Sequence, residues 1–131
     1  MPNPPTMILG IGVDICNVHR LSQLRLKYGA RFLDRVFTPV EQQRCGNGPA
    51  CDERYAARFA AKEAFMKAIG TGWGRELTFL EIEVATEDTG RPVLSVSGGA
   101  RELADRAGVS NIHISLSHER DNAIAFVVLE D

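Results

Sequence analysis

The sequence predicts an α+β fold in which helices pack on a mostly antiparallel sheet. After one apolar strand, the first half of the chain carries helix signatures and long apolar stretches at helical spacing. The second half carries four short segments with strand-like alternation, paired by turn residues and interrupted by one helix. This order, βαααββαββ, separates most helices from most strands along the chain, which is typical of the α+β class.

The first strand is predicted over residues 7–15 and is apolar on both faces, so it is expected to be a central strand. Gly10 and Gly12 begin a pattern typical of dinucleotide-binding loops, but Ile15 stands where that pattern needs a third glycine. The two glycines are therefore expected to allow close packing of the strand backbone. Asp14 is the only charge in the strand and lies near its end.

Two helices with clear start signals follow this strand. Asn17 is a favoured N-cap for a helix over residues 18–28, and Gly29 ends that helix. Thr38, followed by proline and then by Glu41 three residues on, predicts a capping box at the start of a short second helix.

The central helix is predicted over residues 55–70, where nearly every residue favours helix until Gly70 stops it. Asp52 is expected to cap its start. Most of its surface is apolar, so the helix should be largely buried. Its charged residues are Arg58, Lys62, Glu63 and Lys67. Buried charges are costly unless they are paired or bind a ligand; a simple Glu63–Lys67 pair and a functional site both remain open.

Two hairpins and one helix complete the chain. The first hairpin is predicted from strands at residues 79–86 and 93–96, and Ser97 caps a helix that Gly108 ends. The second hairpin joins strands at residues 112–118 and 123–129. In the first of these strands the apolar side chains, Ile112, Ile114 and Leu116, are expected to point away from His113, Ser115 and Ser117.

Charge and composition exclude some classes of partner. The net charge of −2 argues against general nucleic-acid binding, and no run approaches the roughly 20 apolar residues of a membrane span. Residues 20–35 are nevertheless basic, which predicts either an acidic partner or a solvated basic face. Three cysteines, an odd number, fit a reducing compartment better than a disulfide framework. The protein is therefore expected to be cytoplasmic, with residues 1–6 as a disordered tail and residues 7–131 as one domain.

Three segments together resemble the holo-acyl-carrier-protein synthases, the small single-domain 4'-phosphopantetheinyl transferases. The segments are Gly10-Ile-Gly-Val-Asp-Ile15, Arg58-Phe-Ala-Ala-Lys-Glu-Ala-Phe-Met-Lys-Ala68, and Ser115-Leu-Ser-His118 with Ala123-Ile-Ala125. They occur in order and at family-like spacing, and the resemblance covers residues 7–130. It implies the fold of that family and the transfer of the phosphopantetheine arm of coenzyme A to a serine of apo-acyl carrier protein.

The resemblance also implies Mg²⁺, release of adenosine 3',5'-bisphosphate, a role in fatty acid biosynthesis, and a homotrimer that binds coenzyme A between subunits. A non-catalytic module that binds coenzyme A or acyl carrier protein is the alternative. The complete set of Asp14, Glu63 and Lys67 favours the enzyme, because binding alone would not need it.

By resemblance, Asp14 and Glu63 hold Mg²⁺, which prefers carboxylate oxygens. Glu63 is also the candidate general base, directly or through a metal-bound water, since a serine hydroxyl is a weak nucleophile. Lys67 would stabilise or protonate the departing phosphate. The residues expected to contact coenzyme A are Arg58, Lys62, Gly70, Gly72 and His118. Those expected to dock the acidic carrier protein are Arg20, Arg25 and Lys27.

Overall fold

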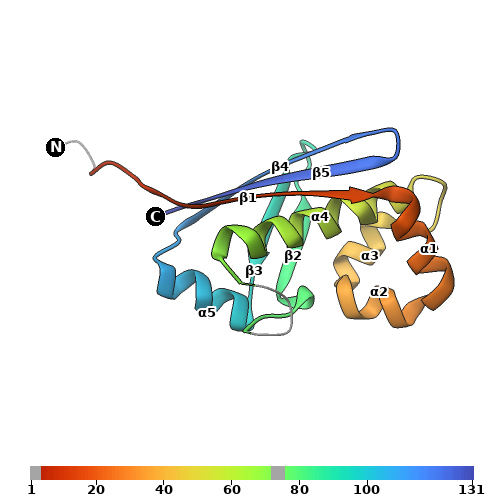
Figure 1. Cartoon of the computed structure of the whole chain (residues 1–131), viewed down its shortest axis with the longest axis horizontal. Helices are drawn as coiled ribbons and strands as arrows, with labels where there is room; N and C mark the ends of the chain where they lie inside the picture. Colours follow the sequence, from red (N-terminus) through yellow and green to blue (C-terminus); the bar gives the residue numbers. More distant parts are fainter. Residues whose placement is uncertain (1–3, 72–75) are drawn as a thin grey trace.

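The structure is a computed structural model that describes residues 4–71 and 76–131 (Figure 1). Its elements are β1 (Ile8–Asn17), α1 (Val18–Tyr28), α2 (Ala30–Val36), α3 (Pro39–Cys45), α4 (Cys51–Ile69), a 3₁₀ turn η1 (Phe79–Glu81), β2 (Ile82–Thr86), β3 (Pro92–Val96), α5 (Gly98–Ala107), β4 (Asn111–Glu119) and β5 (Asn122–Glu130). Helices packed on antiparallel strands confirm the predicted α+β class.

The strands form two antiparallel sheets. One has three strands in the order β1-β5-β4, and the other is the β2-β3 hairpin. Figure 1 shows α4 running along one face of the three-stranded sheet, with α1, α2 and α3 gathered near one end and α5 near the other. The core lies around α4, where Phe65 and four alanines are fully buried: Ala56, Ala60, Ala61 and Ala64. The central helix of the sequence is therefore also the central helix of the fold.

The position of β1 corrects the sequence prediction of a central strand. β1 pairs with β5 alone and forms an edge of its sheet. Its inward side packs on α4, whereas Ile11, Val13 and Ile15 point outward and are 56%, 52% and 60% exposed. The strand is apolar on both sides, but only one side is covered within this chain.

Two glycines bring the backbone of β1 directly against α4, as the sequence predicted. A Cβ atom added at Gly12 would collide with the carbonyl oxygen of Ala64, and one added at Gly10 would collide with that of Ala68. Contact this close needs glycine on the strand. As a result, Asp14 lies against the same helix that carries Glu63 and Lys67.

The predicted helix caps of α1 and α3 are confirmed. The Asn17 side chain accepts a hydrogen bond from the Arg20 backbone N–H at 2.9 Å, and Thr38 and Glu41 form the reciprocal capping box. The sequence prediction missed α2, which follows Gly29 directly and has no side-chain cap. Without a cap or a long apolar period, its seven residues carry little helix signal.

The start of α4 differs from the prediction. The helix begins at Cys51 with Ala50 as its N-cap, so Asp52 lies in the first turn and does not cap it. The Asp52 carboxylate instead accepts two hydrogen bonds from the Arg25 guanidinium, at 2.6 and 3.0 Å. This bidentate pair joins α1 to the first turn of α4.

The two hairpins follow the predicted pairing, with one local change. Residues predicted to begin the first strand form η1, so Leu80 is exposed while Ile82 and Val84 are buried. In β4 the side chains of Ile112 and Ile114 are half-buried and that of His113 is exposed, which confirms the predicted alternation.

The described part of the predicted tail, residues 4–6, has no regular secondary structure, and residues 1–3 lie outside the described residues. The Thr6 hydroxyl donates a hydrogen bond to Glu130 at 3.2 Å. Among the described helices, none is both long and apolar enough to cross a membrane.

Candidate active site

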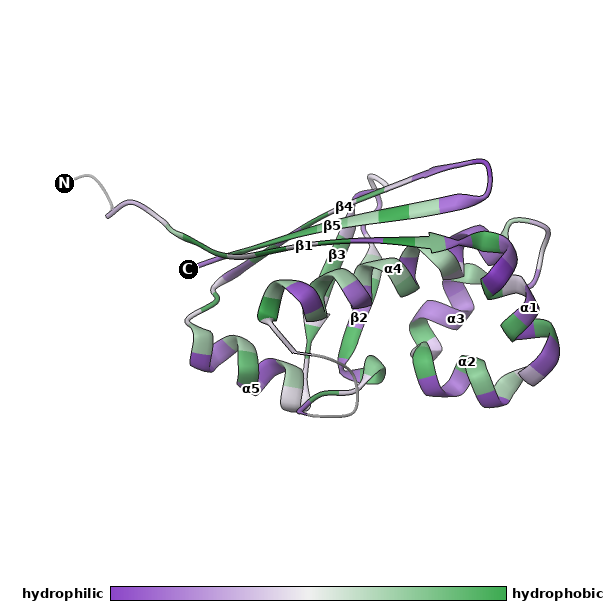
Figure 2. Ribbon diagram, in the orientation of Figure 1, coloured by the Kyte–Doolittle hydropathy of each residue, from purple (hydrophilic) through white to green (hydrophobic). Residues whose placement is uncertain are grey.

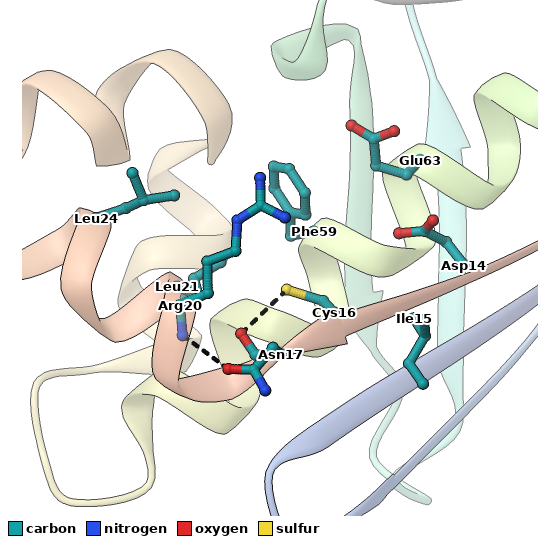
Figure 3. Close-up of a pocket in the computed structure, with 9 residues that line it drawn as sticks. All are labelled: Asp14, Ile15, Cys16, Asn17, Arg20, Leu21, Leu24, Phe59 and Glu63. Carbon is teal, nitrogen blue, oxygen red and sulfur yellow. Dashed lines mark hydrogen bonds between the residues drawn. The ribbon is translucent and has the colours of Figure 1, made fainter.

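A pocket of about 230 Å³ lies where β1, α1 and α4 meet (Figure 3). β1 contributes Asp14 and α4 contributes Glu63. Figure 3 shows these two carboxylates on one side of the pocket, with the Arg20 guanidinium across from them beside Phe59. The structure thus brings together the two residues that the sequence assigned to a metal ion.

Lys67 bonds to Asp14. Of the two possibilities that the sequence left open, the simple Glu63–Lys67 pair is therefore not the one that forms. Its ammonium group donates to Asp14 Oδ1 at 2.9 Å and to the Val13 carbonyl oxygen at 3.1 Å. The Lys67 side chain is 57% exposed and that of Asp14 is 17% exposed. Asp14 therefore has a protein partner.

The environment of Glu63 disfavours its ionised form. Burial raises the pKa of this carboxyl group, and the nearby charge of Asp14 raises it further, while Lys67 and Arg20 act in the opposite direction. Within the part of the chain that the structure describes, no hydrogen bond or ion pair satisfies the Glu63 side chain. A partly buried carboxylate that faces a second carboxylate is a site where an additional positive charge would be stabilised.

The donor set fits Mg²⁺ better than a structural metal. The described residues contain no group of three or more His, Cys, Asp or Glu side chains that could hold a metal ion. Mg²⁺ commonly uses only one or two protein carboxylates and completes its shell with water and substrate phosphate oxygens. Asp14 and Glu63, next to an open pocket, match that requirement.

Lys62 does not fit its predicted role in phosphate binding. Its side chain is fully buried, and its ammonium group donates to Glu41 Oε1 at 2.7 Å, to the Val36 carbonyl at 2.7 Å and to the Phe79 carbonyl at 3.0 Å. An ammonium group has three protons, and all three are used. We therefore assign Lys62 to the interior, where it joins α4 to α3, to the end of α2 and to η1.

A second cleft, of about 310 Å³, contains Arg58 and His118. Arg58 is 5% exposed; one terminal nitrogen donates to the Arg54 carbonyl at 3.2 Å and the other to the Thr86 hydroxyl at 3.3 Å. Its Nε has no hydrogen-bond partner among the described residues. His118 lies within β4, is exposed, and approaches Glu53 to 4.0 Å. Buried guanidinium nitrogens seldom lack a partner, and Arg58 is one of the residues that line this cleft.

Gly70 ends α4, as the sequence predicted, and adopts a left-handed conformation with its backbone N–H bonded to the Met66 carbonyl at 3.0 Å. Gly72, also predicted to contact coenzyme A, lies outside the described residues.

The three predicted docking residues on α1 have different surroundings. Arg20 is exposed on the rim of the carboxylate pocket, and Lys27 is exposed with its ammonium 5.2 Å from the Tyr28 ring centroid. Arg25 is bound to Asp52, and the bond to Arg25 lowers the pKa of that carboxyl group. Arg25 therefore joins α1 to α4. Arg20 and Lys27 remain available to a partner.

Several pocket residues were not predicted from the sequence as parts of the site. Phe59, Leu24 and Cys16 line the pocket beside the carboxylates. Burial and the neighbouring Asp14 raise the pKa of the Cys16 thiol to about 11, so it stays protonated at neutral pH. Phe59 lies one helical turn before Glu63, and that spacing was the available signal for it.

The fold agrees with what comparison with known proteins finds. Residues 10–127 match the 4'-phosphopantetheinyl transferase superfamily, and the chain belongs to this family. Within it, the chain is 47% identical over 125 residues to the holo-[acyl-carrier-protein] synthase of Halothermothrix orenii, which covers 95% of this chain and 99% of the relative.

Two crystal structures of bacterial holo-[acyl-carrier-protein] synthases have the same fold. The Neisseria meningitidis protein is 36% identical with a TM-score of 0.86, over 95% of this chain and all of the other. The Bacillus anthracis protein, solved in complex with CoA (3',5'-ADP), is 40% identical with a TM-score of 0.79, over 95% of this chain and 97% of the other. The predicted family and fold are therefore confirmed.

Proposed function

We propose that this protein is a holo-[acyl-carrier-protein] synthase, which transfers the 4'-phosphopantetheine arm of coenzyme A to a serine of apo-acyl carrier protein. The products are holo-acyl carrier protein and adenosine 3',5'-bisphosphate. The observation that carries this proposal is that Asp14 and Glu63 line one pocket, with Lys67 bonded to Asp14, in a chain 47% identical to a protein of that name. The expected setting is fatty acid biosynthesis in the cytoplasm.

Asp14 and Glu63 are the residues that would hold Mg²⁺. When bound, this ion would neutralise charge on the pyrophosphate of coenzyme A and so favour attack by an alcohol. The fit rests on two adjacent carboxylates, one of which has a raised pKa and no protein partner among the described residues.

Glu63 and Lys67 are suited to move and stabilise charge in the reaction. The serine oxygen attacks the phosphate that carries the pantetheine arm, and the bond from that phosphorus to the departing bisphosphate breaks. Glu63 accepts the serine proton, and its raised pKa brings it closer to the pH at which a general base is effective. Lys67, one turn further along α4, stabilises the negative charge on the departing group.

The cleft around Arg58 and His118 is the proposed site for a phosphate group of coenzyme A. The support for this role is that Arg58, whose buried Nε has no hydrogen-bond partner among the described residues, lines the same cleft as the exposed His118. A guanidinium group offers several donors to phosphate oxygens in a fixed geometry. Gly70 and Gly72 are proposed to lie along the bound coenzyme A.

The exposed cations of α1 are the proposed docking surface for the carrier protein. Acyl carrier proteins are strongly acidic, and Arg20 stands at the mouth of the carboxylate pocket, where the acceptor serine must arrive. Lys27 and the adjoining groove with Arg31 and Arg35 extend this basic surface.

A homotrimer is proposed from the outward face of the three-stranded sheet. Strand pairing places Val13 beside Phe126 and Ile15 beside Ile124 on that face, and all four are substantially exposed. Figure 2 shows hydrophobic colouring along most of β1 and β5. A contiguous apolar face is typical of a protein–protein interface. Light scattering should give a trimer, and Phe126→Asp should give monomers, whereas Val40→Asp, at an exposed position of α3, should leave the trimer intact.

Intact-mass spectrometry of apo-acyl carrier protein tests the proposed reaction. With coenzyme A, this protein and Mg²⁺, the carrier protein should gain the mass of one phosphopantetheine arm, and a chelator should prevent the gain. Asp14→Asn and Glu63→Gln should each remove the gain while circular dichroism shows a folded protein. Normal turnover by either variant would exclude the metal assignment, and no gain across several carrier proteins would exclude the activity.

A further inference from the structure

The ion pair between Lys67 and Asp14 occupies one of the two carboxylates at the proposed metal site. Lys67 Nζ lies 2.9 Å from Asp14 Oδ1 and 3.1 Å from the Val13 carbonyl oxygen, so β1 takes two of its three protons. The proposed catalytic cation is therefore bonded to a residue that the metal would also require.

We propose that Lys67 and the divalent metal ion compete for Asp14, so that binding of the metal displaces the Lys67 ammonium group. Both are positive, and both use the same carboxylate at short range, where like charges repel strongly. Displacement from Asp14 leaves the ammonium free to meet a phosphate of coenzyme A. The inference rests on the proposed function, because it takes Asp14 as a ligand of the metal.

The exposure of the two partners indicates which one moves. The Lys67 side chain is 57% exposed and ends a flexible four-carbon stem, whereas Asp14 is 17% exposed and sits on a strand held against α4 by Gly12. Lys67 can thus leave without disturbing the fold, while Asp14 stays in place.

Lys62 is a lysine of the same helix that a metal ion could not displace. It lies five residues earlier on the same helix, and it is fully buried and bonded to three acceptors. Lys67 has one carboxylate, one carbonyl and an open side toward solvent. The exchange is therefore expected at Lys67 alone of these two.

Competition between Lys67 and the metal ion predicts an effect that would not be expected if Lys67 only bound phosphate. Replacing Lys67 with a neutral residue should tighten metal binding in the absence of coenzyme A, although it slows transfer. The two effects have opposite signs and are measured separately. Coupling between two binding events commonly changes affinity by about 5- to 150-fold.

The test is a titration of the full-length protein with Mn²⁺, followed by electron paramagnetic resonance, without coenzyme A. Mn²⁺ replaces Mg²⁺ because oxygen donors suit both ions. Lys67→Met should bind Mn²⁺ at least about fivefold more tightly than the unmodified protein. Lys67→Arg keeps the charge and should stay near the unmodified affinity. Arg101→Met removes an exposed, ion-paired cation on α5 and serves as the matched control, with no change expected.

The outcomes separate this inference from the proposed metal site. If the unmodified protein binds Mn²⁺ and Asp14→Asn loses it, but Lys67→Met binds equally or more weakly, competition is overturned and the metal site stands. Equal tightening by Lys67→Met and Lys67→Arg would also overturn it, because charge would not be the cause. If neither the unmodified protein nor Lys67→Met binds Mn²⁺, the metal site itself fails.

Discussion

Lys62 and Lys67 lie on the same helix, each bonded to a carboxylate from another element, yet their surroundings differ completely. The Lys62–Glu41 pair is fully buried, with 2.7 Å between Lys62 Nζ and Glu41 Oε1. The Lys67–Asp14 pair borders a pocket, with 2.9 Å between Lys67 Nζ and Asp14 Oδ1. Glu41 also accepts hydrogen bonds from the backbone N–H groups of Thr38 and Val84. The first pair has all its groups satisfied within the protein, and the second can exchange its partners.

The comparison teaches that residue type and helix position do not separate a structural lysine from a functional one. Both lysines fit the family-like segment, and the sequence assigned both to phosphate chemistry. Only the packing of α2, α3 and η1 over one side of α4 encloses Lys62. Lys67 faces β1 at the pocket and stays accessible.

The largest expected effect comes from breaking the sealed pair. Lys62→Met leaves Glu41 charged and buried without its cation, which should reduce the free energy of unfolding by about 3–5 kcal/mol. Urea denaturation measures this change. Adding Glu41→Gln should recover part of the loss, since the buried charge is then gone. A double variant no more stable than Lys62→Met would contradict the explanation.

Breaking the open pair should affect the reaction far more than the fold. Lys67→Met should slow phosphopantetheine transfer by about a hundredfold, because charge on the departing group loses its stabilising donor. The free energy of unfolding should change by less than about 1 kcal/mol, as for other exposed ion pairs. Initial rates and urea denaturation on the same preparation measure both. A large loss of stability would mean that the two lysines do not differ as described.

The stability of Glu63→Gln should differ from that of the unmodified protein in a way that depends on pH. Burial, with the Asp14 charge, raises the folded-state pKa of Glu63 above its usual value of 4.5. The folded protein then binds this proton more tightly than the unfolded chain, so stability falls as pH rises from 4.5 through the folded-state pKa. Glutamine avoids that loss. In the presence of a chelator, thermal unfolding should show the variant more stable at pH 8 by up to about 1 kcal/mol, with no difference near pH 4. An equal gain at both pH values would show that ionisation is not the cause.

Arg25 and Arg20 repeat the contrast on α1 with smaller effects. Arg25→Gln should cost about 1 kcal/mol at neutral pH by removing the bond to Asp52. The Arg25 hydrogen bond lowers the pKa of Asp52 below 3.8, so this contribution is present above pH 3.8 and is lost as pH falls through the folded-state pKa. The KM of Arg25→Gln for acyl carrier protein should not change.

Arg20→Gln should do the reverse. The KM for acyl carrier protein should rise severalfold, and added salt should raise the KM of the unmodified protein in the same way. Denaturation curves should barely move, because Arg20 is exposed. An increase in KM for Arg25→Gln but not for Arg20→Gln would reverse the two assignments.

Much of the fold was accessible from the sequence because local signals are strong where they occur. Asn17, Thr38 and Gly108 mark helix ends through caps that act within a few residues. The short helix α2 has no such cap, and the edge position of β1 depends on which strands pair with it, so neither could be inferred locally. Asp52 looked like a cap because its partner, Arg25, is distant in the sequence.

The site was predicted less completely than the fold for a related reason. Asp14, Glu63 and Arg58 stand where the resemblance implies a role, and the structure brings the first two to one pocket. Lys62 was misassigned because burial is decided by elements packed over α4 from elsewhere in the chain. Arg20 lies on the pocket rim because α1 begins directly after β1, an arrangement that charge patterning along one helix does not reveal.

The contact of Gly10 and Gly12 with the α4 backbone also bears on how the protein folds. Asp14 and Glu63 belong to segments far apart in the sequence, and they meet only when the strand settles onto the helix. This closure spans a long loop and is slower than forming α4 alone. During refolding, helical signal should therefore return before metal binding does. The rate at which metal binding recovers would then report the rate at which β1 docks on α4.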